Sequence, residues 1–167
     1  MNDVAHFYLA IPRRDRMILT AGAIAGGAIL LALAHGIASG AVARSSVASP
    51  WLALHLVAVL PALPLGAYVL CARKGDAVHR ALGRLWAVLM MAAAVSSFGL
   101  RGMTGGLSVI HLLSATVLVM IPRAVLLARR QRIEAHRRTM SLTYLGLAIA
   151  GLFTLLPGRL LGTWLFS

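Results

Sequence analysis

Four histidines occupy matched positions in two similar stretches of the chain. The first stretch begins at His55 and ends at His79, and the second begins at His111 and ends at His136. Both begin with His-Leu, cross an apolar segment to Leu-x-Ala-Arg and a further basic residue, and end with His-Arg. We interpret them as two copies of one helical hairpin, which would create two symmetric pairs of histidines. Neutral imidazole is a good axial ligand for haem iron.

The repeat predicts which histidines form pairs. His55 and His111 lie equally far from the basic ends of their apolar segments, so we expect them at one level as an outer pair. His79 and His136 each precede an arginine where the next helix begins, and we expect them to form an inner pair. At about 1.5 Å of rise per residue the two levels would lie about 20 Å apart. Each pair is predicted to hold one b haem by bis-histidine ligation, with two haems in all.

Composition places the chain in a membrane. Of its 167 residues 60% are hydrophobic and only 12% are charged, with a formal net charge of +12. The basic residues stand in short segments between long apolar runs, which is typical of membrane orientation and argues against nucleic-acid binding. Cys71 is the one cysteine, which excludes an intramolecular disulfide and disfavours a cysteine-rich zinc site.

The predicted fold class is an all-α membrane protein with five transmembrane helices. Pro61 and Pro64 predict a kink in the second of them. The helices are expected at 17–42, 51–72, 78–99, 107–128 and 139–156. The corresponding parts are a lead at 1–16, a peripheral first helix at 17–44, a core four-helix bundle at 45–158 made of the two repeated hairpins, and an interfacial tail at 159–167.

The positions of the basic residues predict an orientation. Only Arg44, Arg101 and Arg159 fall on one side of the predicted membrane, and the other lysines and arginines fall on the opposite side. By the positive-inside rule, the N-terminus is then cytoplasmic and the C-terminus lies outside. We expect a multi-pass protein of the bacterial inner membrane.

Six arginines are candidates for binding the propionates of a haem, because guanidinium groups bind carboxylates bidentately. The alternative is that most of them only set topology and contact lipid phosphates. The candidates are Arg80, Arg84, Arg137 and Arg138 at the inner level, and Arg101 and Arg159 at the outer level.

The histidines also have structural interpretations. His79 and His136, beside arginines, could belong to a collar that contacts lipid headgroups. His55 and His111 could each be hydrogen-bonded to a backbone carbonyl, although ionisable groups within a span are usually functional. His35 is expected to serve packing or hydrogen bonding. A further alternative gathers His35, His55 and His111 around one metal ion or on a proton path.

Several motifs carry a resemblance to known families. HRALGRLW at 79–86, IHLLSA at 110–115, HRRTMSLTY at 136–144 and FTLLPGR at 153–159 resemble predicted bacterial membrane proteins that share a domain of unknown function. The histidine layout is similar to that of the ascorbate-reducible two-haem b-type cytochromes. That resemblance implies ligation by His55 with His111 and by His79 with His136. The chain departs from those cytochromes in having five expected spans instead of six.

These observations predict electron transfer across a lipid bilayer. The donor would be a quinone or a periplasmic protein, with an acceptor on the other face and a membrane or soluble redox partner. The oligomeric state and the presence of an enzymatic activity are left open. The alternative is a non-redox accessory or assembly subunit with structural histidines. Since no carboxylate lies within an expected span, a carboxylate-driven cation transporter is disfavoured.

Overall fold

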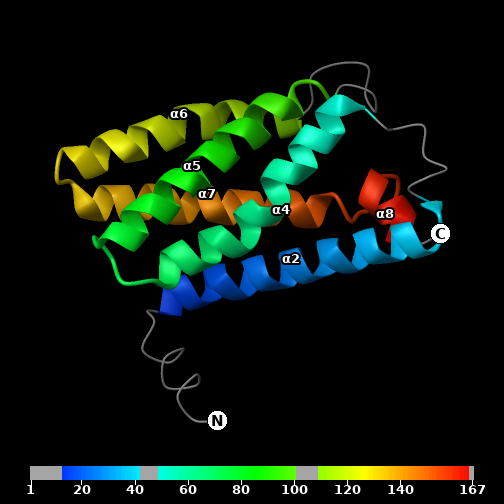
Figure 1. Ribbon diagram of the computed structural model, residues 1–167, viewed down its shortest axis with the longest axis horizontal. Coiled ribbons are helices and arrows are strands. Elements are labelled where there is room, and N and C mark those ends of the chain that lie inside the picture. Colours follow the sequence, from blue (N-terminus) through cyan, green and yellow to red (C-terminus); the bar gives the residue numbers. More distant parts are fainter. Residues whose placement is uncertain (1–12, 42–48, 101–108, 166–167) are drawn as a thin grey trace, which may run out of the picture.

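A computed structural model describes residues 13–41, 49–100 and 109–165, and all regular structure among them is helical (Figure 1). The elements are α2 (Arg13–Ala38), α4 (Pro50–Cys71), α5 (Ala77–Ser97), α6 (Val109–Arg129), α7 (Ile133–Phe153) and the short α8 (Leu160–Leu165). The prediction of an all-α chain is therefore confirmed.

Polar residues in the short connections fix where α4 and α5 begin. The Ser49 hydroxyl accepts a hydrogen bond of 3.2 Å from the amide of Leu52, and Pro50 occupies the first turn of α4, where its missing N–H costs nothing. At the start of α5, the Asp76 carboxylate accepts a hydrogen bond of 2.7 Å from the amide of His79. The Asp76 cap thus fixes the backbone position of His79, a candidate haem ligand.

Two prolines bend α4 in its middle. Pro61 and Pro64 lie inside the helix and remove backbone donors there, and Figure 1 shows α4 changing direction along its length. Within the bend, the Ala62 carbonyl accepts a hydrogen bond of 2.9 Å from the indole Nε1 of Trp86 on α5. The predicted kink is present and is supported by the neighbouring helix.

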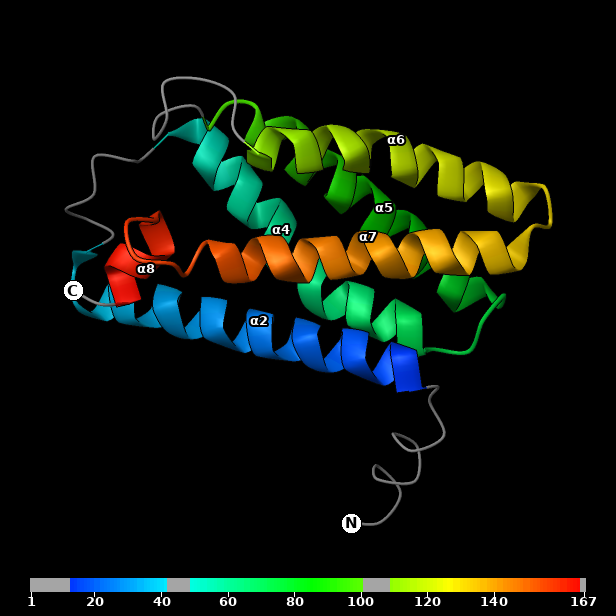
Figure 2. The ribbon, with the colours of Figure 1, turned by 180° about the vertical axis from the view of Figure 1, so that it is seen from behind.

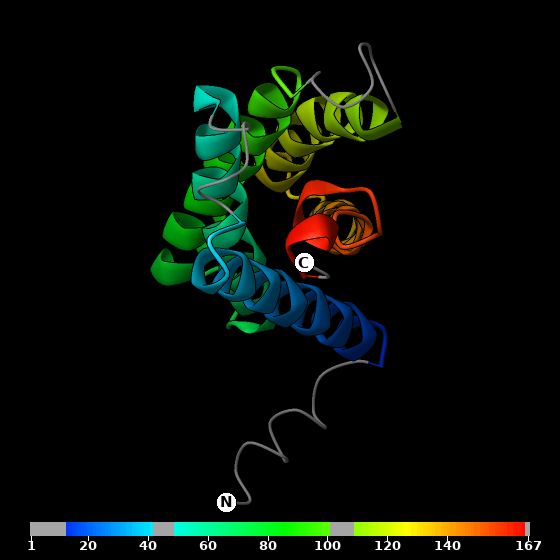
Figure 3. The ribbon, with the colours of Figure 1, turned by 90° about the vertical axis from the view of Figure 1, so that its right-hand side faces the viewer.

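The five long helices pack in a closed sequence. α4 packs against α2 and α5, α6 packs against α5 and α7, and α7 returns to α2 (Figure 3). A smaller contact joins α4 to α7. In the four-helix bundle of α4 to α7, the diagonal pairs are therefore α4 with α6 and α5 with α7. These are the helices that carry the two predicted histidine pairs.

Tyr144 on α7 lies at the centre of the packing. Its ring is fully buried, and a Cβ atom at Gly22 or Gly66 would lie 1.9 Å or 2.7 Å from its atoms. Only glycine lets α2 and α4 approach a large aromatic side chain this closely. Trp86 packs beside Tyr144, with ring centroids 6.5 Å apart. Small and aromatic residues together thus determine how α2, α4, α5 and α7 meet.

Four of the described helices are long and apolar enough to cross a membrane: α2, α4, α5 and α6. α7 has the same 21-residue length as α5, but its first turns contain Glu134, His136, Arg137 and Arg138. It begins at Ile133, six residues before the expected start of the fifth span. α2 likewise begins earlier than expected, at Arg13, and has Asp15 in its first turn.

One end of the bundle gathers the basic connections, and we call it the basic end. It contains the start of α2, the α4–α5 turn at 72–76 and the α6–α7 turn at 130–132 (Figure 1). The Lys74 ammonium donates hydrogen bonds to the Leu70 carbonyl near the end of α4 and, at 2.9 Å, to the carbonyl of Ala72 just after the helix. Burial lowers the pKa of Lys74 from its ordinary value.

Candidate functional site

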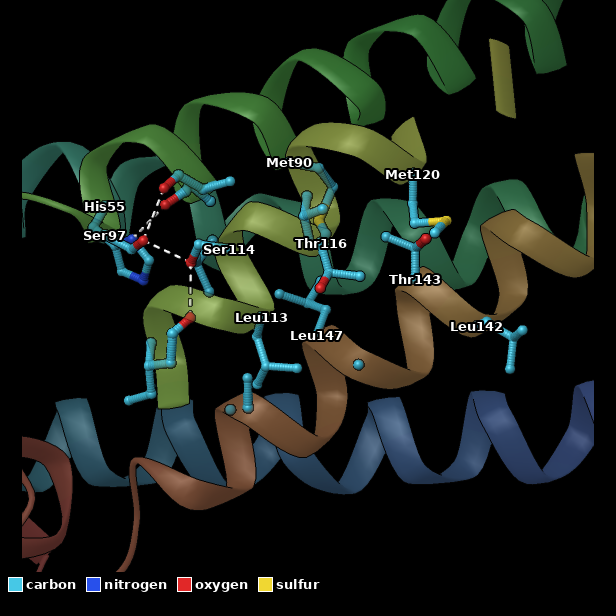
Figure 4. Close-up of a pocket in the computed structure, with 18 of the residues that line it drawn as sticks. His55, Met90, Ser97, Leu113, Ser114, Thr116, Met120, Leu142, Thr143 and Leu147 are labelled. Carbon is cyan, nitrogen blue, oxygen red and sulfur yellow. Dashed lines mark hydrogen bonds between the residues drawn. The ribbon is translucent and has the colours of Figure 1, made fainter. Parts of the chain in front are cut away.

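His55 on α4 is held by α5. Its Nδ1 lies 3.0 Å from the Ala93 carbonyl oxygen and 3.1 Å from the Ser96 hydroxyl, which itself donates to the same carbonyl. Because a carbonyl can only accept, Nδ1 must carry the proton, and the neutral ring keeps its lone pair on Nε2. Figure 4 shows the second ring nitrogen on the side away from these bonds. This is the tautomer that a metal-ligating histidine adopts.

His55 lines a cavity of about 680 Å³ that is bounded mainly by α4, α5, α6 and α7. Figure 4 shows His55, Ser97 and Ser114 at one end of it, with Met120, Leu142 and Thr143 toward the other end. The Ser97 and Ser114 hydroxyls are 2.6 Å apart and link α5 to α6 beside the histidine. A mostly apolar chamber with a few polar groups at one end is typical of a ligand site.

His111 takes a different position from the one expected. It is 5% exposed, and its ring packs against Phe98 with a centroid separation of 5.5 Å. It is not among the residues that line the cavity beside His55. The structure places the two outer histidines on diagonal helices but does not bring both to one chamber.

His79 and His136 lie close enough for their charges to interact. The Nδ1 of His136 is 2.8 Å from the Ala124 carbonyl on α6, so it also carries its proton on Nδ1. The Nδ1 of His79 is buried beside the Val69 carbonyl on α4 and makes no well-formed hydrogen bond. In each case the ring nitrogen faces the partner helix of its own hairpin.

His35 lies apart from the other four histidines, where α2 meets α8. Its Nδ1 is 2.7 Å from the carbonyl oxygen of Trp164, so it ties the end of α2 to α8. Within the described residues, no group of three or more His, Cys, Asp or Glu side chains is placed to hold a metal ion. The alternative that gathers His35, His55 and His111 around one ion is therefore not supported.

The arginines predicted to bind propionates are dispersed. Arg137 forms a salt bridge of 2.8 Å with Asp15 on α2 and lies 3.9 Å from Glu134. The hydrogen bond that Arg137 donates to the Asp15 carboxylate raises the pKa of Arg137. Arg80 donates to the Gly75 carbonyl, which stabilises the α4–α5 turn.

The predicted role of three further arginines stays a prediction. Arg84 is exposed and Arg159 is half-buried. Arg101 lies outside the described residues.

Two arginines line the cavity: Arg138, which is one of the six predicted candidates, and Arg123, which is not. Arg123 on α6 and Arg138 on α7 border its end nearest the α6–α7 turn. Arg123 was missed as a site residue because it resembles any other basic residue near a helix end. The signal that could have identified it is spacing, since Thr116, Met120 and Arg123 fall on one face of α6 at helical intervals.

Comparisons with known proteins identify one family. A family model described as "Predicted membrane protein (DUF2306)" matches residues 52–162, about two thirds of the chain. The match begins within α4 and ends within α8, so it includes all four paired histidines. No curated protein matches the chain, and no solved structure does.

Proposed function

Because the chain belongs to the DUF2306 family of predicted membrane proteins, we propose that it is a multi-pass electron-transfer protein that binds haem b through paired histidines. The observation that carries the proposal is the hydrogen bonding of Nδ1. His55 and His136 both direct this atom to a backbone carbonyl of a neighbouring helix. That arrangement keeps Nε2 deprotonated, as iron ligation requires.

The residues that would hold the cofactor lie on diagonal helices of the bundle. His79 with His136 would form one site, on α5 and α7, and His55 with His111 would form the other, on α4 and α6. A bound b haem would supply reversible one-electron transfer. The two carbonyl contacts fix the rings of His55 and His136 before any ligand arrives, which lowers the entropy cost of binding.

The histidine pair at the basic end fits a haem better than the pair at the opposite end. His79 and His136 lie near each other at this end, and the Ala124 carbonyl already fixes the ring of His136. At the opposite end, His55 borders a cavity of about 680 Å³, and His111 would have to leave its contact with Phe98 to reach it. We therefore expect the His79–His136 site to be the tighter of the two.

The proposal includes an arrangement in the membrane. The basic end would face the cytoplasm, α7 would be a fifth span, and the two haem levels would lie about 20 Å apart along the helices. The α4–α5 and α6–α7 hairpins would be copies related by an approximate two-fold axis along the membrane normal. Electrons would pass between a donor such as a quinone or a periplasmic protein and an acceptor on the other face.

The competing function is a non-redox accessory subunit whose histidines are structural. The same carbonyl contacts would satisfy such histidines, so the hydrogen bonds alone do not separate the two functions. Haem content does. Protein purified from haem-replete cells should contain about two haems per chain by pyridine haemochrome assay.

Single substitutions test the pairing. His136→Ala and His111→Ala should each lower the haem content by about one per chain, while His35→Ala should leave it unchanged. A colourless preparation of folded protein would favour the accessory function. Retention of both haems in His136→Ala would contradict the proposed pairing.

A further inference from the structure

The cavity described above is also a groove that opens between α6 and α7. These helices meet at their connecting turn and diverge away from it, as Figure 2 shows. Lining residues on both helices are exposed, among them Thr116 and Arg123 on α6 and Arg138 and Leu142 on α7. In a membrane, this opening would face the lipid.

Two arginines border the groove at the basic end. The hydrogen bond of 2.8 Å between His136 and the Ala124 carbonyl fixes the register of α6 against α7, which brings Arg123 and Arg138 to neighbouring levels. Arg137 is paired with Asp15, but no carboxylate of the described chain forms a salt bridge with Arg123 or Arg138. Two guanidinium groups that line the same end of the groove without a carboxylate partner favour binding of an anion there.

The rest of the groove suits a hydrocarbon chain. The hydroxyls of Thr116, Thr139 and Thr143 donate to carbonyls one turn earlier in their own helices, at 2.8 to 2.9 Å. With their hydroxyls hydrogen-bonded within the helices, these threonines join Met90 and Leu147 in a mostly apolar lining. On α7 the lining extends from Ala135 to Thr154, about 28 Å at the helical rise.

We propose that this groove binds one anionic phospholipid of the surrounding bilayer. The phosphate lies between Arg123 and Arg138, and one acyl chain enters the groove between α6 and α7. Arginine binds phosphate oxygens bidentately, and the lateral opening admits a lipid that keeps its second chain in the bilayer. The proposal goes beyond electron transfer and does not rest on haem binding.

Native mass spectrometry of the purified full chain tests the proposal. Phosphatidylglycerol and phosphatidylcholine with identical acyl chains are added separately, and bound lipid is counted per protein. We expect one retained phosphatidylglycerol, with about a tenfold preference over phosphatidylcholine. The double variant R123Q/R138Q should abolish the preference. The matched control R129Q/R130Q removes two exposed arginines of the same end that do not line the groove, and should keep it.

A second variant blocks the groove without changing charge. A Cβ atom at Gly146 meets nothing within 4 Å, and Gly146 lines the groove, so Gly146→Leu should fill it without a clash at the backbone. Lipid retention should fall about tenfold, while Gly27→Leu on α2, equally open but outside the groove, should have no effect.

Three results would overturn the proposal. One is equal retention of the two lipids by the unmodified chain, and another is the same loss in R129Q/R130Q as in R123Q/R138Q. The third is preferential binding of oleate, which would assign the groove to a free fatty acid. Haem content of the unmodified chain, measured on the same samples, reports on the proposed electron transfer independently of lipid retention.

Discussion

The indole Nε1 of Trp86 donates a hydrogen bond of 2.9 Å to the carbonyl oxygen of Ala62, which lies between the two prolines inside α4. Trp86 is 2% exposed, so the bond is shielded from water. A bend that removes backbone hydrogen bonds from one helix is thus supported by a side chain of the next. This contact sets the angle at which α4 carries His55 toward α5.

Replacing Trp86 by phenylalanine should destabilise the bundle. The substitution leaves the Ala62 carbonyl without its indole donor and opens a small void, at a cost of about 1–3 kcal/mol. Chemical unfolding in detergent, followed by helix content, measures the change. Tyr68→Phe, at an exposed position of α4, should change stability by less than about 0.5 kcal/mol. Equal effects of the two substitutions would contradict the assigned role of Trp86.

Gly66→Ala should destabilise the protein more than Gly27→Ala. The new Cβ at Gly66 would lie 2.5 Å from the Trp86 Nε1 and 2.7 Å from the ring of Tyr144, and both rings are buried. Overpacking of this kind costs about 1–3 kcal/mol. At Gly27 nothing lies within 4 Å, so alanine should be neutral or slightly stabilising through its helix propensity. Thermal melting of the two variants in the same detergent measures the difference.

The salt bridge between Arg137 and Asp15 joins the first turn of α2 to α7. Asp15→Asn should loosen this end of α2 and cost about 0.5–1 kcal/mol, because the Arg137 side chain is partly exposed. The loss should shrink as salt concentration rises, since screening weakens the bridge in the unmodified protein. Proteolysis near the N-terminus at low and high salt is a direct measurement. A loss that does not change with salt would argue against an electrostatic contact.

The lowered pKa of Lys74 predicts a pH effect on stability. Its ammonium is more easily deprotonated in the folded protein than in the unfolded chain, so the unfolded chain binds more protons just below pH 10.5. Stability should therefore gain a small increment from Lys74 as pH rises through that window. In Lys74→Met the increment should be absent when unfolding is compared between pH 8 and pH 10. An identical pH dependence of stability in both proteins would contradict the assignment of this increment to Lys74.

The helices and their order follow from apolar runs broken by short polar segments. The caps at Ser49 and Asp76 and the bend at Pro61 and Pro64 are local chemistry, and each is visible in the sequence. The early start of α7 at Ile133 was missed because hydropathy marks the apolar core of a span and not the charged turns that extend it. The number of membrane crossings and their direction stay predictions.

The candidate site was less predictable, because it depends on how helices face one another. His55 and His111 lie on diagonal helices, as expected from the two similar stretches, but His111 packs against Phe98. Arg123 and Arg138 line the same cavity because of the register of α6 against α7, which the hydrogen bond from His136 fixes across the hairpin. The spacing of residues within one helix does not predict the register between two helices.

Electron paramagnetic resonance of the oxidised, purified protein tests the central proposal most directly. Ligation by two histidine Nε2 atoms makes ferric haem low-spin, so we expect low-spin signals from the unmodified protein. His136→Ala should lose one of them, while His35→Ala should keep all. Absence of haem from folded protein, or signals unchanged in both His136→Ala and His111→Ala, would contradict the account.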